Sequence, residues 1–278
     1  MSRNMTGWKK IVYLLFVAAF LFAMISPMLY MISASFMSEA DLNQIPPRVL
    51  PSAWSMKNYI AAFVQQPLLR YVFNSFVITI IAVVICITAG SMASYALTRT
   101  NIRFKKVFLI FVLTISLLPT ITLISPIFKM YSKLGLLNSH IGLALIVSVL
   151  DLPMTIWFLT AVFKGIPVSF EESAKLDGAN MFQLFVYIII PLLKASIFSI
   201  SILVFIGAWN RFLLSQVLNQ YEQYRTVVVG LTLYQTSHTI PFGVVAAAGM
   251  ITVLPLLIMV LIFQKNILGG IMEGGVKE

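Results

Sequence analysis

Six long apolar runs constrain the fold of this chain more than any other feature of its sequence. They cover residues 11–33, 71–97, 107–128, 141–163, 191–214 and 244–264. A helix needs roughly 20 apolar residues to cross the hydrocarbon of a bilayer. Unpaired backbone groups are too costly there for loops, and the runs lack the alternation of membrane strands. The sequence therefore predicts an all-α polytopic membrane protein with six transmembrane helices, built as a single transmembrane domain over residues 1–278.

The composition supports a membrane environment and excludes nucleic acid as a partner. Of the 278 residues, 60% are hydrophobic and 10% are charged, against about 25% charged residues in soluble proteins. The net charge is +10, but the basic residues form no dense patch interleaved with aromatic residues, as a nucleic-acid site would. They lie at the ends of the apolar runs, where they orient helices and contact anionic membrane lipid.

The distribution of Lys and Arg predicts the orientation. Without Lys194 at the start of the fifth run, eleven of them fall on the side of the N-terminus and seven on the opposite side. The short 98–106 link holds four of them without an acid. By the positive-inside rule both termini and the 164–190 link are cytoplasmic. The run at 11–33 is longer than the apolar core of a signal peptide, roughly 7–15 residues, so we expect it to remain as the first helix.

The links and the prolines add local detail. The 34–70 link, with Pro46, Pro47, Pro51 and Pro67, is too polar to span, as is the 215–243 link. A short surface helix is predicted at 56–65 from the helical spacing of four apolar residues, which are Met56, Tyr59, Ile60 and Phe63. Prolines within runs should each kink a helix, among them Pro119, Pro126, Pro153 and Pro255. The spacing of Gly90 and Ser94 is typical of close helix packing in membranes.

Enzymatic and metal chemistry find no support in the sequence. There is no phosphate-binding loop of the form G-x-x-x-x-G-K-[ST]. The two histidines, His140 and His238, are far apart, and the single cysteine, Cys86, lies in an apolar run. We therefore predict no catalytic residue, no metal site and no cofactor bound by this chain.

A polar segment between the fourth and fifth runs is the most distinctive motif. It places Glu171, Glu172, Asp177 and Gly178 in one short loop. Ser169 is expected to be the N-cap of a helix, with Glu172 completing a capping box. Gly178 is expected to end that helix in the left-handed conformation, and a second helix is expected from Asn180 to Ile189, with Phe182, Phe185 and Ile189 on one face as its anchor. The result is a compact helical knob. The same pattern of residues is also consistent with a simple capped surface helix.

The segment resembles the "EAA" loop of ABC-importer permeases. The matching residues are Glu172-Ser173-Ala174, Asp177-Gly178-Ala179 and Pro191-Leu192, with Ser173 where the family usually has alanine. Further similarity to carbohydrate-type permeases runs from about residue 54 to the end, and Arg211 stands where the family more often has an acid. This further similarity rests on Arg70-Tyr71, Asn74-Ser75, Ala208-Trp209-Asn210, Phe263-Gln264-Lys265, Gly269-Gly270 and Gly274-Gly275-Val276-Lys277. Overall the chain is similar to the shorter, six-helix permease of maltose-type systems.

The resemblance implies a type I importer in a bacterial inner membrane. The 167–190 loop would be a cytoplasmic coupling helix, on which an ATPase docks. Its coupling residues would be Glu171, Glu172, Ser173, Ala174, Asp177, Gly178 and Ala179. The implied partners are a companion permease in a heterodimer, two ABC ATPases that hold ATP and magnesium, and an extracytoplasmic binding protein that delivers a sugar or oligosaccharide.

Asp151 is the first candidate for the solute pathway because it lies in the middle of the fourth run. A charge at that depth costs roughly 2.5–3.5 kcal/mol or more, so it must face protein or water. It is either a solute contact or a buried acid bonded to a neighbouring helix, and the sequence leaves both open. Weaker candidates, each also explained by helix-to-helix hydrogen bonds, are Asn74, Tyr95, Asn210 and Gln235.

Other functions stay open at the level of sequence. An ABC permease for a polyol, glycerol phosphate or oligopeptide would share the loop. An ion-coupled secondary transporter predicts internal repeats and several midplane acids, and Asp151 is the one clear midplane acid. A membrane scaffold accounts for six helices but gives no reason for the acidic loop.

Overall fold

The computed structural model describes residues 7–46, 48–235 and 241–275, with residues 265–275 described by their backbone only. The described residues form helices, turns and links without a strand. They divide into two compact units, Met1–Leu68 with Leu231–Leu254, and Leu69–Gly230 with Pro255–Glu278. Several residues discussed above lie outside the described part, namely Arg3, Pro47, His238, Val276 and Lys277.

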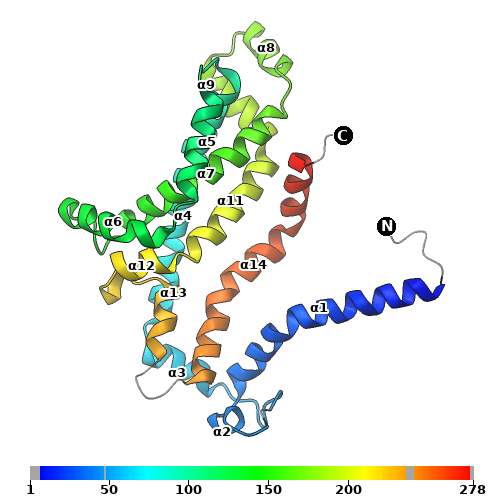
Figure 1. Ribbon diagram of the computed structural model, residues 1–278, viewed down its shortest axis with the longest axis vertical. Coiled ribbons are helices and arrows are strands. Elements are labelled where there is room, and N and C mark those ends of the chain that lie inside the picture. The colour runs from blue at the N-terminus through cyan, green and yellow to red at the C-terminus, as the bar shows by residue number, and fades with distance from the viewer. Residues whose placement is uncertain (1–6, 47, 236–240, 276–278) are drawn as a thin grey trace. The chain divides into compact units, whose positions relative to one another are not determined.

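The helices of the first unit are few. They are α1 (Gly7–Phe36), α2 (Glu39–Leu42), α3 (Lys57–Gln65), the short η4 (Leu231–Tyr234) and the beginning of α14 (Phe242–Gly275). The second unit contains α4 (Leu68–Arg99), α5 (Lys105–Ser116), α6 (Thr120–Leu134), α7 (His140–Lys164), α8 (Ser169–Leu176), α9 (Met181–Gln183), η2 (Leu184–Ile189), α10 (Ile190–Leu192), α11 (Lys194–Trp209), α12 (Phe212–Leu218), η3 (Glu222–Tyr224), α13 (Val227–Gly230) and the rest of α14 (Figure 1).

Four of the described helices, α1, α4, α7 and α14, are each long and apolar enough to cross a membrane. Two bent pairs bring the total to as many as six spans. The range 107–128 is divided between α5 and α6, which meet at 90°, because Pro119 cannot continue the first helix. The range 191–214 is likewise entered through a 78° bend between Leu192 and Lys194, and its helix α11 ends at Trp209.

In the first unit, hydrogen bonds hold α3 against the end of α1. Asn58 Nδ2 donates to Ser35 O at 3.0 Å and to Met37 O at 2.8 Å. The Tyr59 hydroxyl lies 2.9 Å from Ser35 Oγ, and Ala62 is fully buried. The surface helix at 56–65 is thus confirmed. Met56, Ile60 and Phe63 of its apolar face are exposed, and Asn58 lies on the side that packs against α1.

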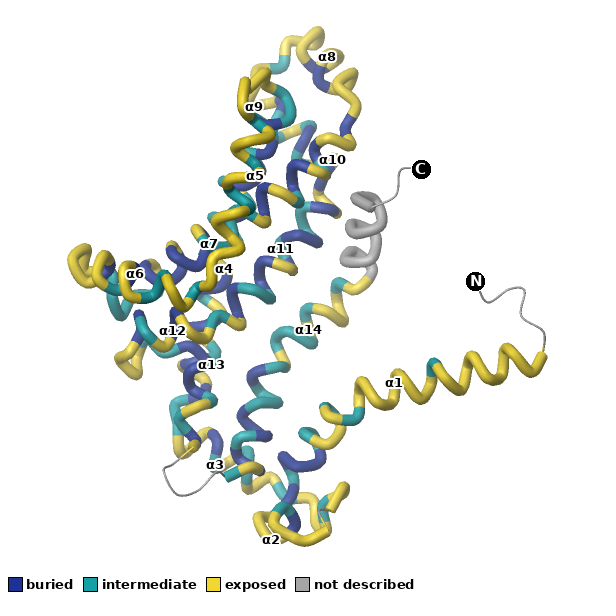
Figure 2. The backbone as a smooth tube through the Cα atoms, viewed as in Figure 1, coloured by how far each residue is buried: buried dark blue, intermediate teal, exposed yellow. Residues whose placement is uncertain are grey.

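Most of α1 is apolar surface without a covering. None of its most apolar window is buried (Figure 2), and its buried residues are confined to Ser33, Ala34 and Ser35 near its end. A surface this apolar is stable only in lipid or against another subunit.

The second unit is organised around α7, which packs against α5 and α11. Helix α4 also lies against α7, since Ser94 Oγ donates to Ile156 O at 3.0 Å and Cys86 Sγ to Ser148 O at 3.4 Å. A Cβ on Gly90 would lie 3.0 Å from Thr155 Cγ2. The predicted close packing of the Gly90 and Ser94 face is therefore confirmed, with α7 as the partner.

Two apolar clusters fill this unit. One joins α4, α6, α7 and α12 and includes Ile78, Ile127, Leu143 and Leu218. The other joins α4, α7 and α11 to the 164–190 segment and includes Phe163 and Ala174. The second cluster gives that segment a packed base on the spanning helices.

Gly90→Leu should destabilise the second unit by about 1–3 kcal/mol, because a larger side chain overpacks the α4–α7 contact. The measurement is thermal unfolding in detergent. Met92→Leu on the exposed side of the same helix is the control, and equal melting temperatures for the two variants would contradict the packing assigned to Gly90.

Candidate functional site

The 164–190 segment leaves α7 through a tight turn and re-enters the membrane helices through a second short helix. Val168 occupies the N-cap of α8 in a helical conformation and makes no side-chain cap. The amides of Glu171 and Glu172 donate to Val168 O at 2.9 and 3.1 Å. The predicted N-cap at Ser169 is therefore wrong, because Ser169 lies inside the first turn, whereas a capping side chain needs extended backbone.

The capping box occurs instead at the second helix of the segment. Gln183 N donates to Asn180 Oδ1 at 2.8 Å, and Asn180 N donates to Gln183 Oε1 at 2.9 Å. Helix α9 continues through the π-helical η2 into α10, so the predicted helix from Asn180 to Ile189 exists and runs slightly further.

Gly178 forms the turn between the two helices with φ of +82°. Ala179 N donates to Ala174 O at 3.0 Å and Gly178 N to Lys175 O at 3.1 Å. These bonds satisfy carbonyls at the end of α8, as a left-handed glycine cap does. The predicted conformation of Gly178 is confirmed.

Glu171 turns inward. Its side chain is nearly fully buried and forms an ion pair with Arg99, the last residue of α4. Its other oxygen accepts a hydrogen bond from Tyr95 Oη at 3.2 Å, and Arg99 Nη2 donates to Ile166 O at 2.9 Å. The expectation that Glu171 faces a partner is corrected accordingly, because both of its oxygens are used inside the chain.

Aromatic rings pack beneath this ion pair. The rings of Tyr95 and Phe185 are 5.3 Å apart, and Phe163 stacks on Phe185 at 8°. Ala174 is buried and Ala179 packs partly against the same cluster. The two alanines therefore face the base of the segment and allow α8 to approach it closely.

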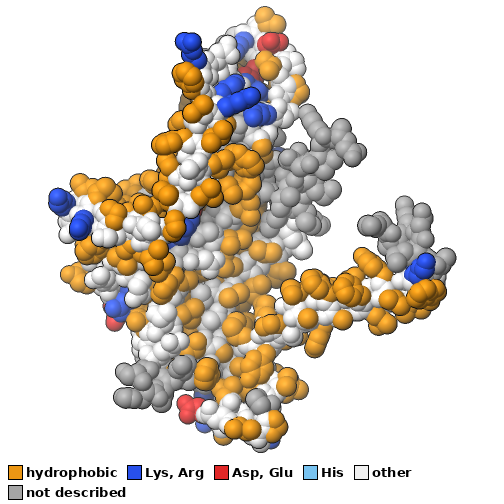
Figure 3. Space-filling model, viewed as in Figure 1, with side chains coloured by type: hydrophobic (Ala, Val, Ile, Leu, Met, Phe, Trp, Pro, Cys, Tyr) orange, Lys and Arg blue, Asp and Glu red, His pale blue; other side chains and the backbone are white. Residues whose placement is uncertain are grey.

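The outward surface of the segment combines polar and apolar residues. Its exposed members within the motif are Glu172, Ser173, Asp177 and Gly178. Large apolar side chains are exposed beside them, namely Leu176 at 89%, Met181 at 61% and Phe182 at 68%. Phe182 thus does not anchor the segment, in contrast to the expectation, while Phe185 and Ile189 do. We call these seven exposed residues the knob surface, and acidic and basic side chains gather around that end of the second unit in Figure 3. An exposed apolar tip with acids beside it is typical of a docking site.

Asp151 forms an ion pair with Arg211. The pair links the middle of α7 to the turn between α11 and α12. Asp151 Oδ2 and Arg211 Nε are both buried without a hydrogen-bond partner among the described residues. This arrangement is compatible with both interpretations of Asp151. The carboxylate is bonded to a neighbouring residue, as a buried structural acid would be, and it still has an unused acceptor for a solute.

The weaker candidates lie apart from this pair. Asn74 is buried and its amide donates to Gln223 O at 3.0 Å and Arg225 O at 2.8 Å, while His140 Nε2 lies 2.8 Å from Asn74 Oδ1. Asn74 therefore holds the link after α12. Tyr95 belongs to the base of the knob, and Asn210 and Gln235 are exposed.

Arg99 is the functional residue that the sequence did not single out. In the sequence it is one of four basic residues of the 98–106 link, and nothing local pairs it with an acid 72 positions later.

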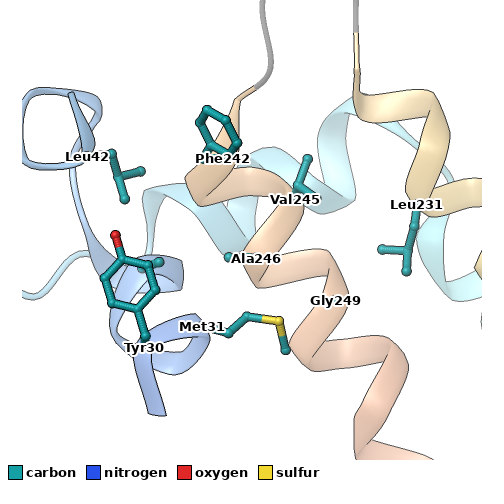
Figure 4. A pocket seen from close by; sticks show the side chains of 9 residues that line it. Tyr30, Met31, Leu42, Leu231, Phe242, Val245, Ala246 and Gly249 are labelled. Carbon is teal, nitrogen blue, oxygen red and sulfur yellow. The ribbon is translucent and has the colours of Figure 1, made fainter. Parts of the chain in front are cut away.

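The apolar pocket of the first unit does not match a solute site. A pocket of about 580 Å³ in the first unit is lined by apolar residues such as Met31, Leu42 and Phe242, with Tyr30 beside them (Figure 4). A sugar needs several convergent polar groups, which this lining lacks. Among the side chains that the structure describes, no group of three or more His, Cys, Asp or Glu is placed to hold a metal ion.

Comparison with known proteins identifies the family. Residues 86–271 match the family described as the binding-protein-dependent transport system inner membrane component. The chain is 34% identical to the sulfoquinovosyl glycerol transport system permease protein of Agrobacterium fabrum, over 90% of this chain and 88% of that one. It is also 34% identical to the trehalose/maltose transport system permease protein of Thermococcus litoralis, over 95% of this chain and 96% of the other.

A solved structure agrees with these relatives. A chain from the crystal structure of a bacterial ABC transporter involved in the import of the acidic polysaccharide alginate matches with a TM-score of 0.77 and 25% identity, covering 92% of this chain and 95% of that one. This chain therefore belongs to the inner-membrane permeases of binding-protein-dependent ABC importers, which are not enzymes. The resemblance read from the loop is confirmed, and the secondary transporter and the scaffold are no longer alternatives.

Replacing Gly178 should cost stability through the backbone alone, because a Cβ at this position meets nothing within 4 Å. A non-glycine residue in the left-handed region costs about 1–2 kcal/mol. Protection of the 164–190 segment from protease should fall in the order Gly178→Asn, Gly178→Ala, Gly178→Val. Ser173→Ala on the exposed side of α8 is the control, and a Gly178→Val protein as resistant as that control would contradict the assigned strain.

Proposed function

We propose that this chain is the permease subunit of an ABC importer that moves a sugar or oligosaccharide delivered by an extracytoplasmic binding protein. One observation carries the proposal. Relatives that match this chain over about nine-tenths of its length are named for transport of a glycosyl glycerol and of trehalose and maltose. A polyol or glycerol phosphate is the competing class of solute.

In this proposal the whole chain is one transmembrane domain with six spans and both termini in the cytoplasm. The bent pair of α5 and α6 counts as one span, and α11 with the end of the 181–192 segment counts as another, so that Met181 and Phe182 stay on the cytoplasmic side. The excess of basic residues in the 98–106 link supports this orientation. The knob surface then lies where a cytoplasmic protein can reach it.

The knob surface is the proposed docking site for an ABC ATPase. Glu172 is exposed and, in the described part of the chain, takes part in no ion pair, so it is free for a basic residue of the partner. Leu176, Met181 and Phe182 would fill an apolar groove beside it, and Gly178 would keep the turn narrow. This arrangement combines a charged pair with desolvated apolar anchors, as in the energetic centre of a protein interface.

The remaining partners follow from the same proposal. ATP and magnesium would be held by two ATPase subunits, and this chain would contribute no group to them. A companion permease would cover apolar surface of this subunit in a heterodimer.

The pair formed by Asp151 and Arg211 is the proposed solute contact. Its unused acceptor and donor, Asp151 Oδ2 and Arg211 Nε, are suited to the hydroxyl groups of a sugar, which donate and accept hydrogen bonds at once. The weaker candidates have structural or peripheral roles in the proposed pathway. Asn74 and Tyr95 are used in hydrogen bonds within the chain, and Asn210 and Gln235 are exposed.

Glu172→Lys should abolish co-purification of the ATPase with this chain from its native membrane. Reversing the charge at an interface pair costs about 2 kcal/mol or more. The control is Lys194→Gln, which lies outside the knob surface. An ATPase that stays bound to the Glu172→Lys variant at wild-type level contradicts docking at this surface.

The class of solute is tested in proteoliposomes that contain the whole complex and its binding protein. Oligosaccharides should stimulate ATP hydrolysis, and polyols and glycerol phosphate should not. Stimulation by a polyol alone would replace the sugar assignment.

Replacing Asp151 and Arg211 together by Leu and Met should leave assembly intact and lower solute uptake. Hydrogen bonds to charged groups contribute about 1.5–3 kcal/mol each, so uptake should fall at least about tenfold. The double replacement removes both charges at once and so avoids leaving one of them buried alone. Uptake at the wild-type rate would make the pair purely structural.

A further inference from the structure

Arg99 joins three separate parts of the second unit at one point. It is the last residue of α4. Its Nε bonds to Glu171 in α8, and its Nη2 donates to Ile166 O in the turn after α7 at 2.9 Å. One planar guanidinium thus fixes the end of α4, the exit of α7 and the body of α8 in a single arrangement.

The two neighbouring acids of α8 point in different directions. Glu171 and Glu172 are neighbours on α8, yet Glu171 is 2% exposed and Glu172 is exposed. Successive residues of a helix point about 100° apart, so one acid faces the base while the next faces outward. The outward acid belongs to the knob surface, and the inward acid belongs to the connection with α4.

Few other polar bonds attach α8 to the spanning helices. It is connected by the turn at 165–168 on one side and by the left-handed turn at Gly178 on the other. Its remaining anchorage is apolar packing around the small side chain of Ala174. Apolar packing is not directional, whereas the planar guanidinium of Arg99 bonds the carboxylate of Glu171 through Nε and Ile166 O through Nη2, which fixes both partners relative to it.

Stability alone does not explain why charges are used here. Both side chains are largely buried, at 12% exposed for Arg99 and 3% for Glu171. Burying a charged pair costs desolvation that the attraction between the charges often only offsets, and apolar residues of similar size serve stability as well or better. A buried pair does fix one arrangement of the elements that it joins.

We propose that Arg99 is a positioning residue that couples movement of α8 to α4, with Glu171 as its partner and Tyr95 holding the second carboxylate oxygen. A push on the knob surface then displaces the end of α4 as part of one rigid body. Helix α4 in turn lies against α7 through Gly90 and Ser94, so the displacement reaches the helix that carries Asp151. The inference rests on the proposed function, since the push comes from the ATPase.

The experiment compares charge reversals in the assembled importer. Arg99→Glu and Glu171→Arg are made singly and together, and three quantities are measured: ATPase co-purification, basal ATP hydrolysis and its stimulation by solute-loaded binding protein. The single variants should keep the bound ATPase and lose stimulation at least about fivefold, the lower end of typical coupling between sites. The double variant should restore a substantial part of the stimulation because the pair is rebuilt in reverse. Arg103→Glu is the matched control, since Arg103 belongs to the same link and forms no ion pair among the described residues.

A conservative variant tests the same inference if a charge reversal prevents folding. Arg99→Lys keeps a positive charge beside Glu171 but offers one ammonium nitrogen, which cannot occupy the positions of both Nε and Nη2 of the planar guanidinium. It should assemble with an unchanged melting temperature and still show reduced stimulation. Tyr95→Phe, which removes only the hydroxyl, should show a smaller loss.

Two results would overturn the inference. One is full stimulation in Arg99→Lys and in the single reversals. The other is a loss of stimulation that follows the loss of melting temperature in every variant and is not restored by the double reversal. Failure of the proposed function looks different, because the wild-type chain would then bring down no ATPase at all.

Discussion

Hydrocarbon offers no hydrogen bonds, and this single constraint decides where the polar groups of the chain can lie. The spanning segments are helices because only helices satisfy their own backbone in lipid. Several buried polar side chains follow the same constraint. Asn74 uses both ends of its amide, Ser94 donates across to α7, and Ser148 donates back along its own helix at 2.6 Å. Four charged groups of the second unit form two ion pairs, Arg99 with Glu171 and Asp151 with Arg211.

The pairing of Arg99 with Glu171 gives the two adjacent acids of the loop separate tasks. A motif with two glutamates reads as a single acidic surface, but the helix turns one of them into the protein and the other out of it. The inward acid, the alanines and the aromatic rings make the segment part of the membrane body. In the proposed function, the outward acid and the exposed apolar tip form the surface on which the ATPase docks. The proposed function uses both, because the ATPase would push on the outward face and the inward face would pass that push to the spanning helices.

The sequence predicted the elements of this fold better than their faces. Apolar runs of spanning length and the resemblance in the loop led to the correct class of protein, and the left-handed Gly178 was predictable because few residues adopt that conformation. Faces depend on neighbours that are distant in sequence. Phe182 fits an anchoring face by its spacing and is exposed, and Ser169 has the right chemistry for a cap in the wrong backbone conformation. The role of Arg99 depends on a partner 72 residues away, which no local pattern reveals.

The order in which the chain is synthesised gives the Asp151–Arg211 pair a consequence for biogenesis. The two residues are 60 positions apart, so α7 reaches the insertion machinery well before its cation has been translated. During that interval the carboxylate has no partner from its own chain, and a lone charge at this depth disfavours insertion by roughly 2.5–3.5 kcal/mol. Before Arg211 is available, α7 must remain at the translocon, insert with Asp151 protonated, or be stabilised by contacts with helices already inserted. Once Arg211 has been translated, it can form the ion pair with Asp151. We then expect α7 and α11 to be stabilised in the membrane together.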